Sequence, residues 1–311
     1  MEQPQTEVQE QPANSLAAGV DPSPVRPSTE PAVNVVSPQA CATCGTTPAA
    51  NASAAAVAPP SYVYVIGHIE PRFPLLSIEQ EARQITARAG GASKETDREV
   101  MAKLLGDPKN KYLVRQLCWV LSVLGVETYI LIPRDGDYQP LIDAYRAEPN
   151  PGDIELVIGV RGPVAPPAMC NGLQVPIVIF DQIYAFDRDT LLKSIKKDAD
   201  QKFIKAAAEM FDRIMGQRDN AGATHCDRAV NYLSVRYDRI YSLAAEQFNS
   251  DSSFTGIDCL PSPLSGTRRV VDVVFSYTNR TTDVVSKFFT RVDVTECFPF
   301  LVTKMSPYYD R

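Results

Sequence analysis

Large apolar side chains are nearly absent from the first sixty residues and then recur in two distinct patterns. Residues 1–60 contain no Phe, Tyr or Trp, a single leucine (Leu16), and ten of the 25 prolines. Such a segment cannot bury enough apolar surface to offset the entropy lost on ordering. We therefore predict a disordered Pro/Ala-rich linker over residues 1–60 and one folded domain over residues 61–311.

In the first half of this domain, short apolar runs alternate with amphipathic segments. Runs rich in β-branched and aromatic residues predict strands at 62–67, 127–133, 154–160 and 175–180. Apolar residues at helical spacing predict helices at 77–89, 95–105, 111–124 and 140–146. Ser77 and Gln80 resemble a capping box, and Pro71 with Pro74 predicts a loop before it. The alternation indicates a mixed central sheet with some parallel pairing.

The second half has a helical segment followed by strands. The predicted helices are 200–216, 224–235 and 237–248. The predicted strands, which we expect to be antiparallel, are 253–259, 268–277, 283–294 and 298–304. A hairpin turn containing Asn279 and Arg280 joins two of them. The complete pattern indicates an α+β fold.

Charge and composition exclude some functions. The chain has 311 residues and a net charge of −6; residues 1–60 hold Arg26 and five acidic residues, a net of −4, which leaves −2 for the domain. A near-neutral domain argues against general nucleic-acid binding. No apolar run reaches the roughly 18 residues of a membrane span, and no signal peptide is visible. Seven scattered cysteines predict a reduced, cytoplasmic protein.

The linker holds one motif with metal-binding chemistry. Cys41 and Cys44 are spaced C-x-x-C and followed by glycine, as in zinc knuckles. Zinc needs four ligands, so two would have to come from other residues or from another copy of the chain. The candidates within the chain are Cys118, Cys170, Cys226, Cys259, Cys297 and His225. The alternatives are free linker thiols or half of a site shared with a partner.

Candidate binding residues follow the predicted strands. His68, Glu70 and Arg72 come just after the first strand and offer a base, its orienting carboxylate and an anion clamp. The alternative is that Glu70 and Arg72 pair with each other or with neighbours and that His68 caps the strand. Arg161 lies at the end of a predicted strand, just before a proline-rich loop at 162–172. The loop either presents a binding edge or is only a rigid crossover between strands.

Other polar residues of interest are Asn171, in an Asn-Gly turn of this loop, and Asp181, at the end of a buried strand. We expect Asp181 to face the same side as Arg161 and His68. Cys170 is interpreted as structural because nothing nearby lowers its pKa. His225 and its neighbours begin a helix, where Asp227 is interpreted as a capping residue.

Seven collinear runs in the domain closely resemble one known family, the C-terminal domain of the cyanobactin maturation protease PatG, with a related domain in PatA. The runs are 62–74 (YVYVIGHIEPRFP), 115–121 (RQLCWVL), 157–163 (VIGVRGP), 167–173 (PAMCNGL), 179–184 (IFDQIY), 275–280 (FSYTNR) and 298–304 (FPFLVTK). The resemblance implies a role in making ribosomally produced, post-translationally modified peptides. It does not carry over the family's protease activity, because this chain lacks the subtilisin-like domain and its motifs.

The resemblance therefore leads us to expect an accessory, non-catalytic module that binds a precursor peptide or peptide-maturation enzymes. Formation of a homodimer is a further role that the resemblance leaves open. The alternative is an enzyme, either an uncharacterised peptide-modifying one or a zinc-dependent one. The chain is then a stand-alone homologue or a fragment of a longer protein. The residues expected to bind are His68, Glu70, Arg72, Arg161, Asn171, Asp181, Asn279 and Arg280.

Overall fold

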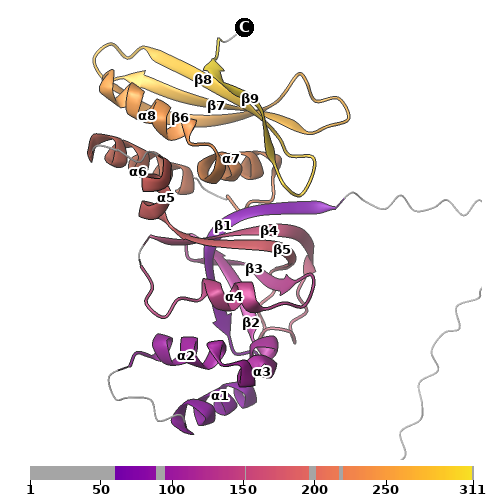
Figure 1. Ribbon diagram of the computed structural model, residues 1–311. Helices are drawn as coiled ribbons and strands as arrows, with labels where there is room; N and C mark the ends of the chain where they lie inside the picture. Colours follow the sequence, from indigo (N-terminus) through magenta and orange to yellow (C-terminus); the bar gives the residue numbers. More distant parts are fainter. Residues whose placement is uncertain (1–59, 89–94, 151, 196–200, 217–219, 310–311) are drawn as a thin grey trace, which may run out of the picture. The chain divides into compact units, whose positions relative to one another are not determined.

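The computed structural model describes residues 60–88, 95–150, 152–195, 201–216 and 220–309. The chain divides into two units, Met1–Ala56 and Val57–Arg311, and all described residues belong to the second. This unit contains a strand barrel, a group of helices and a separate four-stranded sheet (Figure 1). The predicted α+β class is confirmed.

The first half forms a closed five-stranded barrel in the order β1-β2-β3-β5-β4. Its strands are β1 (Ser61–Arg72), β2 (Cys118–Val123), β3 (Val126–Pro133), β4 (Asp153–Val164) and β5 (Pro176–Asp187). The β3–β5 pair is parallel and the other four pairs are antiparallel, which confirms the mixed sheet. Closure of the sheet into a barrel was not predicted.

Strand β1 closes the barrel because its two halves pair with different neighbours. Residues 61–67 pair with β4, and residues 68–72 pair with β2. Gly67 lies at the change of partner, where a Cβ atom would be 2.3 Å from the carbonyl oxygen of Ser122. The loop predicted at Pro71 is wrong, because Pro71 lies within β1 opposite Trp119. β4 no longer pairs with β1 there, so the missing proline N–H breaks no ladder bond.

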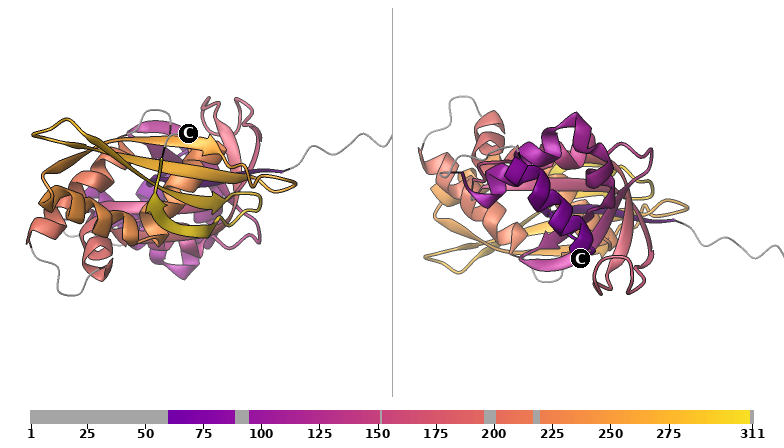
Figure 2. Two further views of the ribbon diagram at one scale, coloured as in Figure 1. Left: turned by 90° about the horizontal axis from the view of Figure 1, so that it is seen from above. Right: turned by 90° about the horizontal axis from the view of Figure 1, so that it is seen from below.

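Three helices cover one end of the barrel (Figure 2, right). They are α1 (Leu76–Arg88), α2 (Asp97–Gly106) and α3 (Lys111–Gln116), with the short helix η1 (Pro108–Asn110) between the last two. Leu105 and Leu113 pack with Val65 inside the barrel. Helix α1 begins one residue before Ser77, so the predicted cap there is wrong. The first capping box of the described chain is instead at α2, formed by Thr96 and Glu99.

The helix predicted over 111–124 is wrong beyond Gln116, because 118–123 form strand β2. Trp119 and Leu121 belong to the main barrel core, whereas Cys118 and Val120 belong to a second cluster on the other face of the strand. A strand buried on both faces has a continuous apolar sequence, and such a sequence also fits helical spacing. A short helix, α4 (Gln139–Ala144), follows β3 and confirms the helix predicted at 140–146.

The second half confirms most of its predicted elements. The helices are α5 (Arg188–Ile195), α6 (Gln201–Met215), α7 (His225–Arg236) and α8 (Arg239–Asn249). The antiparallel strands, in sheet order, are β6 (Ser252–Pro261), β7 (Val270–Asn279), β8 (Val285–Asp293) and β9 (Phe300–Pro307). Helix α5 was not predicted, because its eight residues contain only three apolar side chains, too few to define a helical stripe.

Helix α7 contacts both the barrel and the four-stranded sheet (Figure 1). Tyr232 and Val235 pack against Tyr64 of β1, on the outer face of the barrel. Leu233 faces a separate core that includes Phe275 of β7. Both long sides of this helix are therefore buried, against different layers.

A buried amide pair fixes α7 on β1. The Nδ2 atom of Asn231 donates to the carbonyl oxygen of Tyr64 at 2.8 Å and to Oδ1 of Asn220 at 3.0 Å. Asn220 donates back to Oδ1 of Asn231 at 2.7 Å. The backbone N–H of Tyr64 donates to the carbonyl of Gly222, whose φ of +66° and close approach to β1 require glycine.

Disulfides join Cys118 to Cys170 and Cys226 to Cys259, so the reduced state predicted for these cysteines is wrong. The pairs are 52 and 33 residues apart, and a scattered sequence pattern does not reveal such tertiary pairing. The structural role predicted for Cys170 agrees with its bond. Among the described residues, Cys297 is the free cysteine, and no helix is long and apolar enough to cross a membrane.

Replacing Asn231 with alanine should destabilise the domain by about 2 kcal/mol, because it leaves the buried carbonyl of Tyr64 and the amide of Asn220 without partners. Urea denaturation measures this. Asn249→Ala, at the exposed end of α8, is the matched control and should change stability by less than about 0.5 kcal/mol. Equal effects of the two substitutions would contradict the role given to the Asn231 amide.

Candidate functional site

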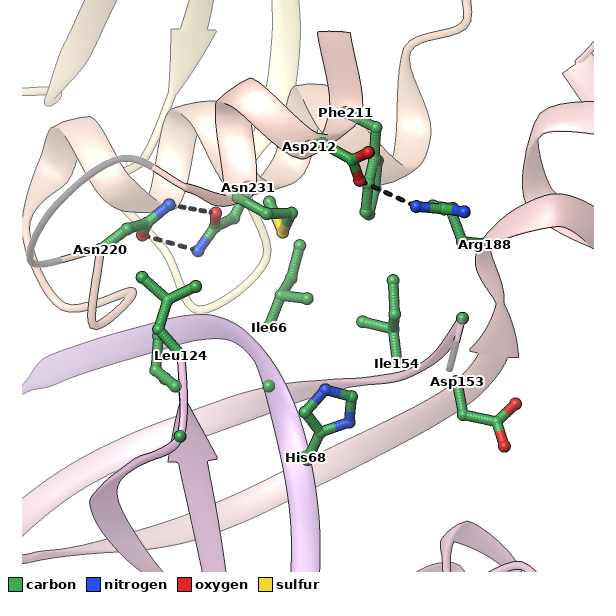
Figure 3. A pocket seen from close by; sticks show the side chains of 15 residues that line it. Ile66, His68, Leu124, Asp153, Ile154, Arg188, Phe211, Asp212, Asn220 and Asn231 are labelled. Atoms are coloured by element: carbon green, nitrogen blue, oxygen red, sulfur yellow. Dashed lines mark hydrogen bonds and ion pairs between the residues drawn. The ribbon is translucent and has the colours of Figure 1, made fainter. Parts of the chain in front are cut away.

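A pocket of about 470 Å³ lies where the barrel meets helices α5, α6 and α7 (Figure 3). Its barrel side comes from the bend in β1, the tip of the β2–β3 hairpin and the start of β4. Its volume is in the range of small-molecule and side-chain binding sites.

The inner surface of the pocket is mainly apolar. Ile66 of β1 and Ile154 of β4 come from the barrel, and Phe211 and Met215 come from α6. Phe211 is 2% exposed and also belongs to the core between the helices and the sheet. The apolar surface is therefore held by elements that are themselves well packed.

Polar side chains on the helical side of the pocket are paired with each other (Figure 3). Arg188 of α5 is 2.9 Å from Asp212 of α6. The Asn220–Asn231 amide pair lies on the opposite side. Asp153 points away from the other lining residues and pairs with Arg146. These groups can orient a ligand, and their mutual pairing leaves the apolar surface as the main source of binding energy.

His68 is the predicted residue that lines this pocket. Its side chain is half exposed, and its Nδ1 lies 3.7 Å from Oε2 of Glu155, a buried carboxylate. The same oxygen accepts the backbone N–H of Ile69 at 3.2 Å. Glu155 raises the pKa of His68, and this effect exceeds the lowering by partial burial.

Leu124 adopts an unfavourable backbone conformation at the edge of the pocket. Leu124 and Gly125 form the two-residue turn between β2 and β3, with φ values of 51° and 77°. Such turns favour Asn-Gly or Asp-Gly, because leucine in the left-handed region costs about 1 kcal/mol. The Leu124 side chain is nevertheless 60% exposed. Sequence reasoning missed this residue because it took Gly125 as the end of a helix.

Glu70 and Arg72 do not join His68 in one constellation. Glu70 is 3.2 Å from Arg98 of α2, and Arg72 pairs with Glu127 of β3. Glu70 and Arg72 therefore each pair with a neighbouring residue, as in the alternative interpretation.

Arg161 and Asp181 are also separate from His68. Along the β1–β4 ladder, Arg161 is opposite Ser61, whereas Glu155, the partner of His68, is opposite Gly67. Six strand positions separate the two places, roughly 20 Å. Asp181 pairs with Arg134. The convergence expected for His68, Arg161 and Asp181 is wrong.

The remaining candidates lie in turns. Asn171 is exposed, with a φ of 48°. Asn279 accepts backbone N–H groups of Thr281 and Thr282, and Arg280 packs over Phe248 and bonds Ser253. These contacts account for local turn structure, and the binding roles stay predictions.

The zinc prediction concerns residues outside the described part of the chain, because Cys41 and Cys44 lie in the first unit. Four of the six residues considered as completing ligands are engaged in the two disulfides. Among the described residues, no group of three or more His, Cys, Asp or Glu side chains is arranged to hold a metal.

Two protein-family models match this chain. The model described as "PatG Domain" matches residues 62–249, and the model described as "PatG C-terminal" matches residues 197–308. The chain belongs to the PatG domain family. The two matches overlap over α6, α7 and α8, the helices between the barrel and the sheet.

A solved structure described as "PatG Domain of Unknown Function" is similar to this chain at 20% sequence identity. The alignment covers 80% of this chain and 99% of that one, with a TM-score of 0.64. At this identity the likeness establishes a shared fold. A search of curated proteins found no match.

Replacing Glu155 with glutamine should lower the pKa of His68, because the carboxylate that raises it most is removed while the opposing effect of partial burial remains. The amide oxygen of the new side chain would keep an acceptor for the N–H of Ile69. NMR titration of the two imidazoles measures this, with His225 as the internal control. Because Glu155 raises the pKa of folded His68, the stability gained from this pair is complete below the unfolded-state pKa of His68, while Glu155 is ionised, and is lost as pH rises through the folded pKa. An unchanged His68 pKa would contradict the assignment.

Proposed function

We propose that this domain is a non-catalytic accessory module in the biosynthesis of ribosomally made, modified peptides of the cyanobactin type. It binds a precursor peptide, and an apolar side chain of that peptide enters the pocket beside Leu124. Membership of the PatG domain family supports the pathway.

The observation that carries the binding proposal is the conformation and exposure of Leu124. A large apolar residue held in a left-handed turn and left 60% exposed contributes little to the stability of the free domain. Its backbone cost is offset if the side chain contacts a ligand, and strained residues of this kind cluster at ligand sites. Ile66, Ile154 and Met215 continue the apolar surface into the pocket.

The polar groups support binding over catalysis. Arg188, Asp212, Asn220 and Asn231 are engaged in mutual pairs. Outside the pocket, burial and then Asp181 raise the pKa of Cys297 to about 11, so this thiol is protonated near neutral pH and is a poor nucleophile.

The proposal is tested by NMR titration of the chain with overlapping synthetic peptides that span a cyanobactin-type precursor peptide. We expect at least one peptide to shift the signals of Leu124, Ile154 and Met215 together, with the peptide mass unchanged by mass spectrometry. A change of peptide mass without any other protein would instead establish an enzyme. No response to any peptide would contradict the peptide-binding module.

Leu124→Asn separates stability from binding. Asparagine tolerates the left-handed region, so the variant should be more stable than the wild type by about 1 kcal/mol in urea denaturation. It should also weaken binding of the responding peptide severalfold, because the apolar contact is lost. Leu264→Asn is the matched control, since Leu264 is also 60% exposed and lies in another turn. A Leu124→Asn variant that binds normally would contradict the role of this side chain.

A further inference from the structure

Three basic side chains gather at the start of α7, away from the pocket. Nη1 of Arg269 lies 2.9 Å from Nε2 of His225, the first residue of the helix. Arginine has only donors, so His225 must accept through Nε2 and is therefore neutral in this arrangement. Arg269 precedes β7, and its backbone bonds Thr295 at 2.7 Å and Val294 at 2.8 Å, which fixes its position.

Arg228, one helical turn from His225, is a buried cation without a carboxylate partner among the described residues. It is 2% exposed, and its guanidinium donates to the carbonyl oxygens of Val294 at 2.7 Å, Glu296, and Cys297 at 3.3 Å. Its Nε has no partner within the described structure. The guanidinium also lies 5.4 Å from the centroid of the Tyr62 ring. Carbonyl dipoles and an aromatic face do not neutralise a buried charge, so a positive potential is left around it.

Two neighbouring carboxylates already have partners. Asp227 accepts the backbone N–H of Thr224 in the capping box of α7, which confirms its predicted capping role. Asp293 pairs with Arg268 and accepts the N–H of Thr295. Burial, and then the charges of Arg269 and Arg228, lower the pKa of His225. The charges that act on the pKa of His225 are therefore cationic, although the Asp227 carboxylate lies in the same first turn of α7.

We propose that His225 and Arg269, in the field of Arg228, bind an oxyanion at the start of α7. One oxygen would replace the His225 ring nitrogen as acceptor for Arg269, a charge-assisted bond. A second would accept from His225 once the ring is protonated, and the positive end of the helix dipole favours the same charge. The chemistry fits a carboxylate of an acidic peptide or a phosphate, and it does not depend on the pocket or on the proposed function.

Proton uptake is part of this binding. A bound anion stabilises the charged imidazolium and removes the repulsion that keeps His225 neutral. The pKa of His225 therefore rises on binding, and affinity increases as pH falls through it. A rise of about one pH unit corresponds to roughly tenfold tighter binding to the protonated form.

The experiment follows both histidine side chains by NMR over a pH titration with inorganic phosphate, and separately with acetate, at ionic strength held constant with chloride. We expect phosphate to raise the pKa of His225 by about one unit and to leave His68 unchanged. An effect of both anions shows that carboxylates are accepted, and an effect of phosphate alone identifies phosphate as the ligand chemistry.

Arg269→Gln is the decisive variant, because the Arg269 side chain is exposed and its replacement leaves the core intact. Without anion, its His225 pKa should be higher than in the wild type, since one repelling charge is gone, and phosphate should no longer shift it. Arg115→Gln, at an exposed position of α3, should behave as the wild type. The proposal is overturned if neither anion moves the His225 pKa, if His68 moves equally, or if Arg269→Gln retains the response.

Discussion

The packing of α7 is the constraint on which the rest of the domain depends. Both long sides of this helix are buried, one on the outer face of β1 and the other on the four-stranded sheet. Asn231 adds a directional bond to the Tyr64 carbonyl. Because that amide is almost fully buried, its position is specified far more strictly than that of an apolar residue. Helix α7 thereby fixes the positions of the barrel and the four-stranded sheet relative to each other.

The pocket is a consequence of this arrangement. The same Asn231 that bonds β1 also lines the pocket with Asn220, and α6 supplies the apolar wall behind it. The bend of β1 at Gly67 places His68 at the pocket, while the rest of the strand continues into the barrel wall. The same few elements thus carry both the side chains that stabilise the fold and those that line the pocket. The strained turn at Leu124 lines the pocket but contributes little to the stability of the fold.

Parts of the fold could be predicted because their signals are local. The helices at 201–249 have clear amphipathic stripes, and the antiparallel strands after them have regular turns. The strand at 118–123 could not be identified, because both of its faces are buried and its apolar run fits a helix equally well. Barrel closure depends on β1 changing partner at Gly67, and the disulfides join distant residues; neither has a local signature. The same holds for the pocket, of which His68 alone was predicted, since Leu124, Phe211 and Asn231 meet only through tertiary packing.

The central claim is that α7 makes the barrel and the sheet one cooperative unit. Trp119, the single tryptophan of the chain, is buried in the barrel core, so its fluorescence reports on the barrel. Far-ultraviolet circular dichroism also reports on α6, α7 and α8. Equilibrium urea denaturation followed by both signals should give coincident transitions with one midpoint. Two separate transitions, with the barrel unfolding independently of the helices, would contradict the account.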